Sequence, residues 1–201
     1  MNKKIVNYLY ELFPNPKCEL EYSKDYELLI AIMLSAQTKD ERVNQVTRVL
    51  FTKYPSLDEL SKANLNDVIE IIKPIGTYNK KALNVIDIAK SLLPFKRVPN
   101  DRAFLESLPG VGHKTANVFL SMIYQEPCFA VDTHVRRVSI RLGLACEDDT
   151  LKEIEDKLMA FFKDYNITDL HHQLVLFGRY HCKALKPNCE NCKLKSICSK
   201  K

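Results

Sequence analysis

Four of the seven cysteines stand close together, and their spacing could hold a metal centre. They are Cys182, Cys189, Cys192 and Cys198, in the pattern C-x6-C-x2-C-x5-C. If thiols stay reduced, four in one loop need a metal to stabilise their thiolates. Structural zinc sites usually have two short C-x2–4-C knuckles, whereas one short gap between two longer ones suits a 4Fe–4S cluster better. The spacing therefore favours a 4Fe–4S cluster, with zinc or no metal as alternatives.

A glycine-containing turn precedes a lysine at the expected start of a helix. Leu108-Pro109-Gly110-Val111-Gly112 ends one helical pattern, and a second opens at His113-Lys114. Glycines let a backbone approach a phosphate, and the amides that open a helix can donate to it. Such a helix-hairpin-helix binds a DNA backbone without reading its sequence. The alternative is an ordinary turn between helices.

Two further side chains could act on a substrate. Lys114 follows the hairpin, and a helix N-terminus disfavours a charged amine, whereas a lysine nucleophile must be neutral. Asp132 precedes an arginine-containing helical pattern, where an aspartate commonly caps the helix. A role as helix cap and a role at a substrate are compatible. The plain alternatives are a solvated surface lysine and a structural N-cap.

The net charge is concentrated at one end of the chain. Residues 182–201 hold six lysines and one acid, Glu190, and so carry the whole formal charge of +5. A basic tail on a neutral body indicates a polyanionic partner, although it could be a solvated terminus. Apolar residues make up 46% of the chain, too many for disorder, and no membrane span or signal peptide is recognisable. We therefore expect a cytoplasmic protein.

Helix signals recur along the chain, and no strand alternation is convincing, so the fold is expected to be all-α. Thr38, Ser56 and Thr150 each begin a possible capping box. Between residues 78 and 93, Leu83 and Ile86 fall on the expected apolar face. The other expected helices cover 3–12, 26–35, 65–72, 101–107, 114–124, 133–142, 151–164 and 168–181, with one more after Thr38.

Taken together, these segments resemble the endonuclease III branch of the helix-hairpin-helix glycosylase superfamily. The matching segments are collinear: 34–38, 75–79, 108–117, 131–134, 178–182 and the cysteine loop. The resemblance implies two helical domains that flank a DNA-binding cleft. A six-helix barrel with the helix-hairpin-helix would cover 18–126, and a 4Fe–4S cluster domain would cover 1–17 and 127–201.

The resemblance also implies a reaction in base-excision DNA repair. Lys114 would displace an oxidised pyrimidine through attack on the sugar, and Asp132 would stabilise the developing charge. A lysine Schiff base would then allow β-elimination, which cleaves the strand 3′ to the abasic site. The implied partner is double-stranded DNA that contains damaged bases or abasic sites. The protein is expected to be a monomer that associates with the nucleoid and does not bind a membrane.

The remaining implied roles concern binding. One 4Fe–4S cluster, structural or redox-sensing, would be held by Cys182, Cys189, Cys192 and Cys198. The implied DNA contacts are Gln37, Thr77, Leu108, Gly110, Gly112, Lys193 and Lys195.

Two positions depart from the pattern of this family. Thr77 stands where many relatives have leucine, and His113 replaces a common arginine.

Three rival functions would each have a distinguishing feature. A mismatch-specific adenine glycosylase would carry serine in place of Lys114 and an extra C-terminal domain. A non-catalytic DNA-binding or redox-sensing module would lack Lys114 or Asp132. A zinc-bound structural protein would be colourless.

Overall fold

The computed structural model describes residues 1–199, and those residues are helical with no strand. The all-α prediction is confirmed. The chain divides into two compact units, Glu19–Tyr124 and the combination of Met1–Cys18 with Gln125–Lys201. Their limits differ from the expected domain boundaries by one residue at the first junction and two at the second.

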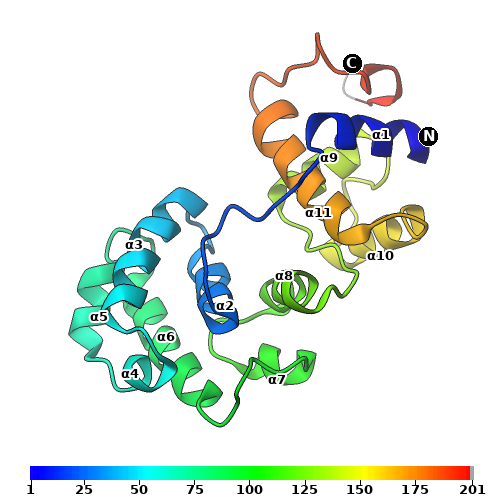
Figure 1. Ribbon diagram of the computed structural model, residues 1–201. Helices are drawn as coiled ribbons and strands as arrows, with labels where there is room; N and C mark the ends of the chain where they lie inside the picture. Colours follow the sequence, from blue (N-terminus) through cyan, green and yellow to red (C-terminus); the bar gives the residue numbers. More distant parts are fainter. Residues whose placement is uncertain (200–201) are drawn as a thin grey trace. The chain divides into compact units, whose positions relative to one another are not determined.

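The unit Glu19–Tyr124 is built around a buried central helix. Helix α2 (Asp25–Leu34) is almost entirely apolar and is buried from Tyr26 to Leu34, as expected of a helix surrounded by others. It packs against α3, α6 and α8 (Figure 1). The remaining helices of the unit are α3 (Asp40–Lys53), α4 (Leu57–Ser61), α5 (Leu65–Ile72), α6 (Tyr78–Leu92), α7 (Arg102–Ser107) and α8 (His113–Tyr124).

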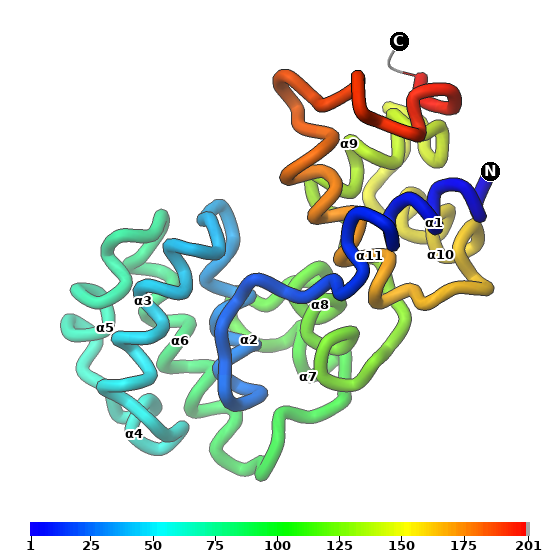
Figure 2. The backbone as a smooth tube through the Cα atoms, turned by 45° about the horizontal axis from the view of Figure 1, so that its top comes forward, coloured from blue at the N-terminus to red at the C-terminus, as the bar shows by residue number. Residues whose placement is uncertain are grey.

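The other unit joins both ends of the chain. Its elements are α1 (Asn2–Leu12), α9 (Thr133–Arg141), α10 (Leu151–Phe161), α11 (Ile167–Leu176), a π-helical turn η1 (Phe177–His181) and a 3-10 turn η2 (Lys195–Ile197). The C-terminal segment lies along α1 (Figure 2). Tyr8 donates to the carbonyl of Asn191 at 3.0 Å, and Lys4 donates to Ser196 at 2.8 Å. Ile5 and Leu9 of α1 are buried in the same apolar cluster as Leu194, so residues distant in sequence share one core.

Two of the three residues expected to cap a helix N-terminus do so in the structure. Thr150 and Glu153 form a complete capping box, and Ser56 accepts from the amide of Glu59. The capping box expected at Thr38 is wrong. Helix α3 begins only at Asp40, because Thr38 still belongs to the turn after α2 and donates its amide to Ser35 at 3.0 Å.

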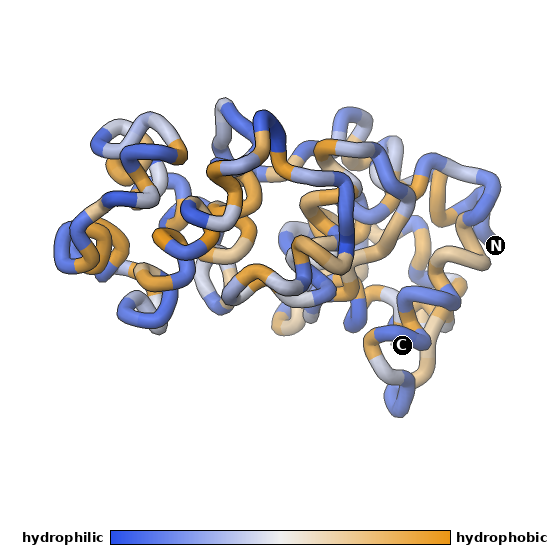
Figure 3. The backbone as a smooth tube through the Cα atoms, turned by 90° about the horizontal axis from the view of Figure 1, so that it is seen from below, coloured by the Kyte–Doolittle hydropathy of each residue, from blue (hydrophilic) through white to orange (hydrophobic). Residues whose placement is uncertain are grey.

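Burial follows hydropathy within each unit. Figure 3 shows apolar stretches turned toward neighbouring helices, with hydrophilic stretches on the outer turns. In the described part of the chain, no helix is both long and apolar enough to cross a membrane.

Candidate functional site

The hairpin between α7 and α8 is anchored by buried apolar residues. Leu108 and Val111 are buried, and the amide of Val111 donates to the carbonyl of Leu108 at 3.1 Å. Gly110 has φ +79, and a Cβ there would lie 2.4 Å from the Asn84 side chain of α6. Only glycine combines this conformation with so close an approach. Gly112 is different, since nothing lies within 4 Å of its Cβ position.

Lys114 is the second residue of α8 and is exposed. Within residues 1–199 its amine has neither a hydrogen bond nor an ion pair, so it can reach a ligand. The neighbouring His113 is engaged locally. Its Nδ1 lies 3.1 Å from Glu106 Oε1, and its Nε2 lies 3.2 Å from the Asn117 amide. The departure at His113 therefore belongs to a polar network beside the hairpin.

The loops that carry Gln37 and Thr77 both hold a left-handed backbone. Gln37 has φ 59 and Thr77 has φ 55, and both side chains are exposed. This conformation is costly for any residue other than glycine, and most of all for a β-branched one. Such strain persists only where the surroundings enforce it, which is common at ligand sites.

A buried lysine that the sequence reasoning missed connects these two loops. Lys81 of α6 is only 5% exposed, whereas the expected apolar residue Leu83 is 48% exposed. The Lys81 amine donates at 2.8 Å to the carbonyls of Leu34 and of Ala36. Burial lowers the pKa of Lys81. The only signal in the sequence was the run Lys81-Ala82-Leu83, which did not indicate which residue faced inward.

Asp132 is the N-cap of α9 in the other unit. Its Oδ1 accepts from the amides of His134 and Val135, each at 2.8 Å. The second carboxylate oxygen, Oδ2, has no hydrogen-bond donor among the described residues. The structural reading of Asp132 is therefore correct, and one oxygen stays available. Lys114 and Asp132 belong to different units.

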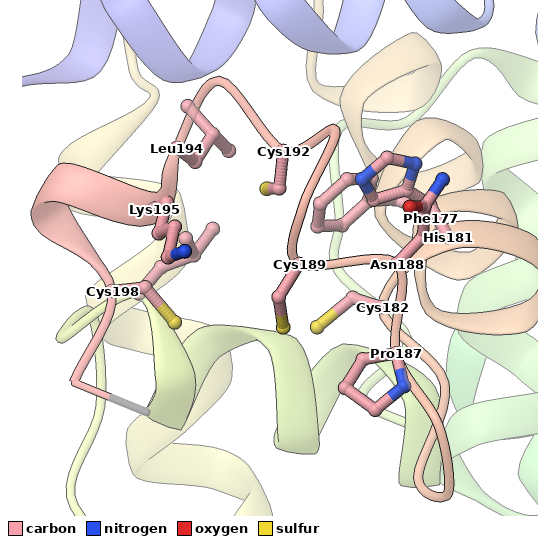
Figure 4. Close-up of a pocket in the computed structure, with 11 residues that line it drawn as sticks. Phe177, His181, Cys182, Pro187, Asn188, Cys189, Cys192, Leu194, Lys195 and Cys198 are labelled. Carbon is pink, nitrogen blue, oxygen red and sulfur yellow. The ribbon is translucent and has the colours of Figure 1, made fainter. Parts of the chain in front are cut away.

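The four clustered cysteines line one pocket of the unit that contains both chain ends. Figure 4 shows their side chains projecting from the loop toward a common space. Apolar side chains of Leu142, Phe177 and Leu194 line the same pocket. None of the four thiols is in a disulfide. No group of three or more metal-binding side chains in the described chain converges on a position for a single ion.

Two arginines of α9 hold the beginning of this cysteine loop. Arg137 donates to the carbonyls of Gly178 at 2.7 Å and Cys182 at 3.2 Å. Arg141 donates to Cys182 Sγ at 3.3 Å and to the Lys183 carbonyl at 2.8 Å.

Burial raises the pKa of the Cys192 thiol, and its three cysteine neighbours raise it further. Four thiolates in this pocket would need cationic charge, so the donor set fits an iron–sulfur cluster.

The two tail lysines expected to bind DNA have different surroundings. Both are exposed. Lys193 forms an ion pair with Glu11, and its amine lies 5.8 Å from the centre of the Tyr8 ring. Lys195 is the first residue of η2, and it forms no ion pair with any described residue. Of the other tail lysines, Lys200 and Lys201 lie outside those residues.

Comparison with known proteins gives consistent similarities. Residues 30–164 match the family described as HhH-GPD superfamily base excision DNA repair protein. The chain is 44% identical to endonuclease III of Bacillus subtilis, over 94% of the chain and 87% of that protein. It is 41% identical to endonuclease III of Escherichia coli K12, over 100% and 98%. A solved structure of a trapped endonuclease III–DNA covalent intermediate superposes with a TM-score of 0.92 at 41% identity, covering 99% of this chain and 96% of that one.

Proposed function

Because the chain belongs to the HhH-GPD superfamily of base excision DNA repair proteins, in its endonuclease III branch, we propose that it is a bifunctional DNA glycosylase and abasic-site lyase. Its proposed substrates are oxidised pyrimidines and abasic sites in double-stranded DNA, on which it acts as a nucleoid-associated monomer. The observation that carries the proposal is the exposed amine of Lys114 directly after the hairpin, which has no partner among residues 1–199. The similar structure of a covalent DNA intermediate supports this role.

Lys114 acts as the nucleophile in this proposal. A weakly stacked damaged base leaves the helix at a cost of a few kcal/mol. The neutral amine then attacks C1′ of the sugar, the C1′–N bond breaks, and the base leaves with the bonding electrons and gains a proton. Loss of a proton and opening of the sugar ring give an imine between the Lys114 nitrogen and C1′.

The same imine makes the strand-cleaving step accessible. It acidifies the C2′ hydrogen, so a base can remove that proton. The electrons form a C2′–C3′ double bond, and the C3′–O bond breaks with the phosphate as leaving group. This β-elimination cuts the strand on the 3′ side of the abasic site.

Asp132 stabilises the positive charge that develops on the sugar as the base departs. The geometry supports this assignment because Oδ1 is occupied by two backbone amides while Oδ2 accepts from no described donor. The two capping hydrogen bonds therefore fix the orientation of the carboxylate and use only its Oδ1 atom as an acceptor.

The DNA backbone is held by the hairpin, where Leu108 anchors the turn, Gly110 shapes it, and Gly112 leaves room for a phosphate. Gln37 and Thr77 fill and flank the gap left by the extruded base. Lys193 and Lys195 add sequence-independent attraction to phosphates.

The cysteine pocket holds one 4Fe–4S cluster in this proposal. Cys182, Cys189, Cys192 and Cys198 are its ligands, and the cluster supplies structural order or redox sensing rather than hydrolysis. Iron analysis and visible absorption of the purified protein test this part, because zinc thiolates are colourless. A colourless, zinc-loaded protein would contradict it.

Borohydride trapping on a duplex with one thymine glycol tests the reaction. We expect a covalent protein–DNA adduct with the unaltered protein and with the control Lys62→Ala, an exposed lysine of the short loop after α4. The adduct should disappear in Lys114→Ala, while DNA binding is retained.

The other outcomes separate the rival functions. Base release without an adduct would indicate a monofunctional glycosylase. Adenine release from a mismatch, without release of thymine glycol, would indicate the adenine-specific branch. DNA binding with neither release nor nicking, on lesion and abasic duplexes alike, would indicate a non-catalytic module.

A further inference from the structure

Lys81 of α6 is a buried lysine that the proposed chemistry does not use. Its side chain is 5% exposed, yet it forms no ion pair among the described residues. Burying an ammonium group is strongly unfavourable unless its donors are satisfied. Here the amine meets the carbonyl of Leu34, the carbonyl of Ala36 and, at 3.4 Å, the hydroxyl of Thr38. Three acceptors match the three N–H donors of a lysine.

The acceptors all belong to the segment that contains Gln37. Leu34 is the last residue of α2, and carbonyls at a helix end lack intrahelical donors. Ala36 and Thr38 flank Gln37, whose φ of 59 is unfavourable. The Lys81 amine therefore binds on both sides of the strained residue and offsets the cost of its conformation.

The backbone of Lys81 acts on the second loop. Its amide donates to the carbonyl of Thr77 at 3.1 Å and closes the first turn of α6. Thr77 is the N-cap of that helix in a left-handed conformation. Any non-proline residue at this position can make that bond, so the Lys81 side chain itself restrains only the segment that contains Gln37.

We propose that Lys81 is a positioning residue that holds the Gln37 loop ready to enter the DNA stack when the damaged base is extruded. This inference rests on the proposed function for its consequence, although the restraint itself does not. Lys81 touches no reacting atom. It acts by lowering the entropic cost of ordering the Gln37 loop at the moment of binding.

The test variant is Lys81→Met, which keeps the length of the side chain and removes its donors. Stability should change little, because the loss of a buried charge offsets the two carbonyls left without a donor. Lys81→Arg keeps the donors and serves as the conservative variant. Lys80→Met, at an exposed position of the same helix, is the matched control.

We expect Lys81→Met to lower kcat/KM on a thymine glycol duplex by on the order of tenfold to a hundredfold. The loss should be much smaller on single-stranded abasic DNA, which has no base to extrude and no opposite base to support. Lys81→Arg should recover part of the duplex activity, and Lys80→Met should match the unaltered protein. An equal loss on both substrates would overturn the positioning role.

Amide hydrogen exchange separates this inference from the proposed function. Exchange within 35–39 should become faster in Lys81→Met and stay unchanged in Lys80→Met, with or without enzymatic activity. Unchanged exchange in Lys81→Met would overturn the restraint, even if the chain proved to be a glycosylase. Absence of base release and trapping in the unaltered protein would overturn the proposed function and leave the restraint standing.

Discussion

At the scale of single residues, one aspartate performs a structural task that is easily confused with a catalytic one. Asp132 caps α9 through one carboxylate oxygen and keeps the other without a described donor. A helix cap requires only an acceptor, whereas stabilisation of a sugar cation requires negative charge. The two roles can therefore be separated by a substitution that preserves the acceptor and removes the charge.

Asp132→Asn is that substitution. Asparagine caps helices about as well as aspartate, so unfolding should be nearly unaffected. Base release should fall by roughly a hundredfold or more, because the charge beside the sugar is lost. Thermal unfolding and single-turnover base release measure the two effects.

Asp132→Ala provides the comparison. It should show the same loss of base release and an additional loss of about 1 kcal/mol in stability, since alanine cannot cap. If Asp132→Asn released the base at the unaltered rate, Asp132 would be a cap and nothing more.

At the scale of elements, most helices and the buried faces of α3 and α6 were predictable, whereas the inward or outward direction of single residues at the edge of a face was not. The expected spans 65–72 and 101–107 agree closely with α5 and α7 because caps and apolar spacing bound them locally. The π-helical turn after Leu176 carried no such signal. In α6 the apolar pattern placed Leu83 inward, but the neighbouring helices instead bury Lys81, whose amine has backbone partners. Only tertiary contacts supply that information.

The candidate site shows the same division. The hairpin and the four cysteines were recognisable because their chemistry depends on short spacings. The strained backbone at Gln37 and Thr77 was not, since neither residue type favours a left-handed conformation. The roles assigned to the site residues stay predictions.

The hairpin itself yields a prediction about its two glycines. Gly110→Ala should destabilise the protein by at least about 1 kcal/mol, because it combines a left-handed backbone with a contact against Asn84. Gly112→Ala should cost less than about 0.5 kcal/mol, since the position is open. Chemical denaturation measures both.

DNA affinity distinguishes the glycines further. Gly112→Ala should weaken DNA binding without loss of stability if a phosphate approaches the backbone there. Equal destabilisation by the two substitutions would contradict the different surroundings of the two glycines.

At the scale of the whole molecule, the charge is distributed unevenly. The last twenty residues carry the net formal charge, and the rest of the chain is neutral. Lys193 is already paired with Glu11, but exposed ion pairs contribute little to stability and exchange readily with a phosphate. Removal of these lysines should therefore affect DNA binding more than folding.

Changing Lys193 and Lys195 together to alanine should weaken binding on every DNA sequence alike. The slope of log affinity against log salt should become shallower by up to about two phosphate equivalents. Fluorescence anisotropy across a salt series measures it. The control pair Lys62→Ala and Lys73→Ala, exposed lysines of the other unit, should leave the slope unchanged, and an unchanged slope in the tail variant would remove the tail from the interface.

The division of the chain has a consequence for its synthesis on the ribosome. The unit Glu19–Tyr124 is one continuous segment, whereas the other unit combines the first eighteen residues with the last part of the chain. The continuous unit can fold during translation, because all of its sequence has emerged before the second unit is complete. Helix α1 must wait for α11 and for the C-terminal segment that holds Asn191 and Ser196. A newly made chain therefore passes through a stage in which its central unit is folded while its first helix still lacks its neighbours.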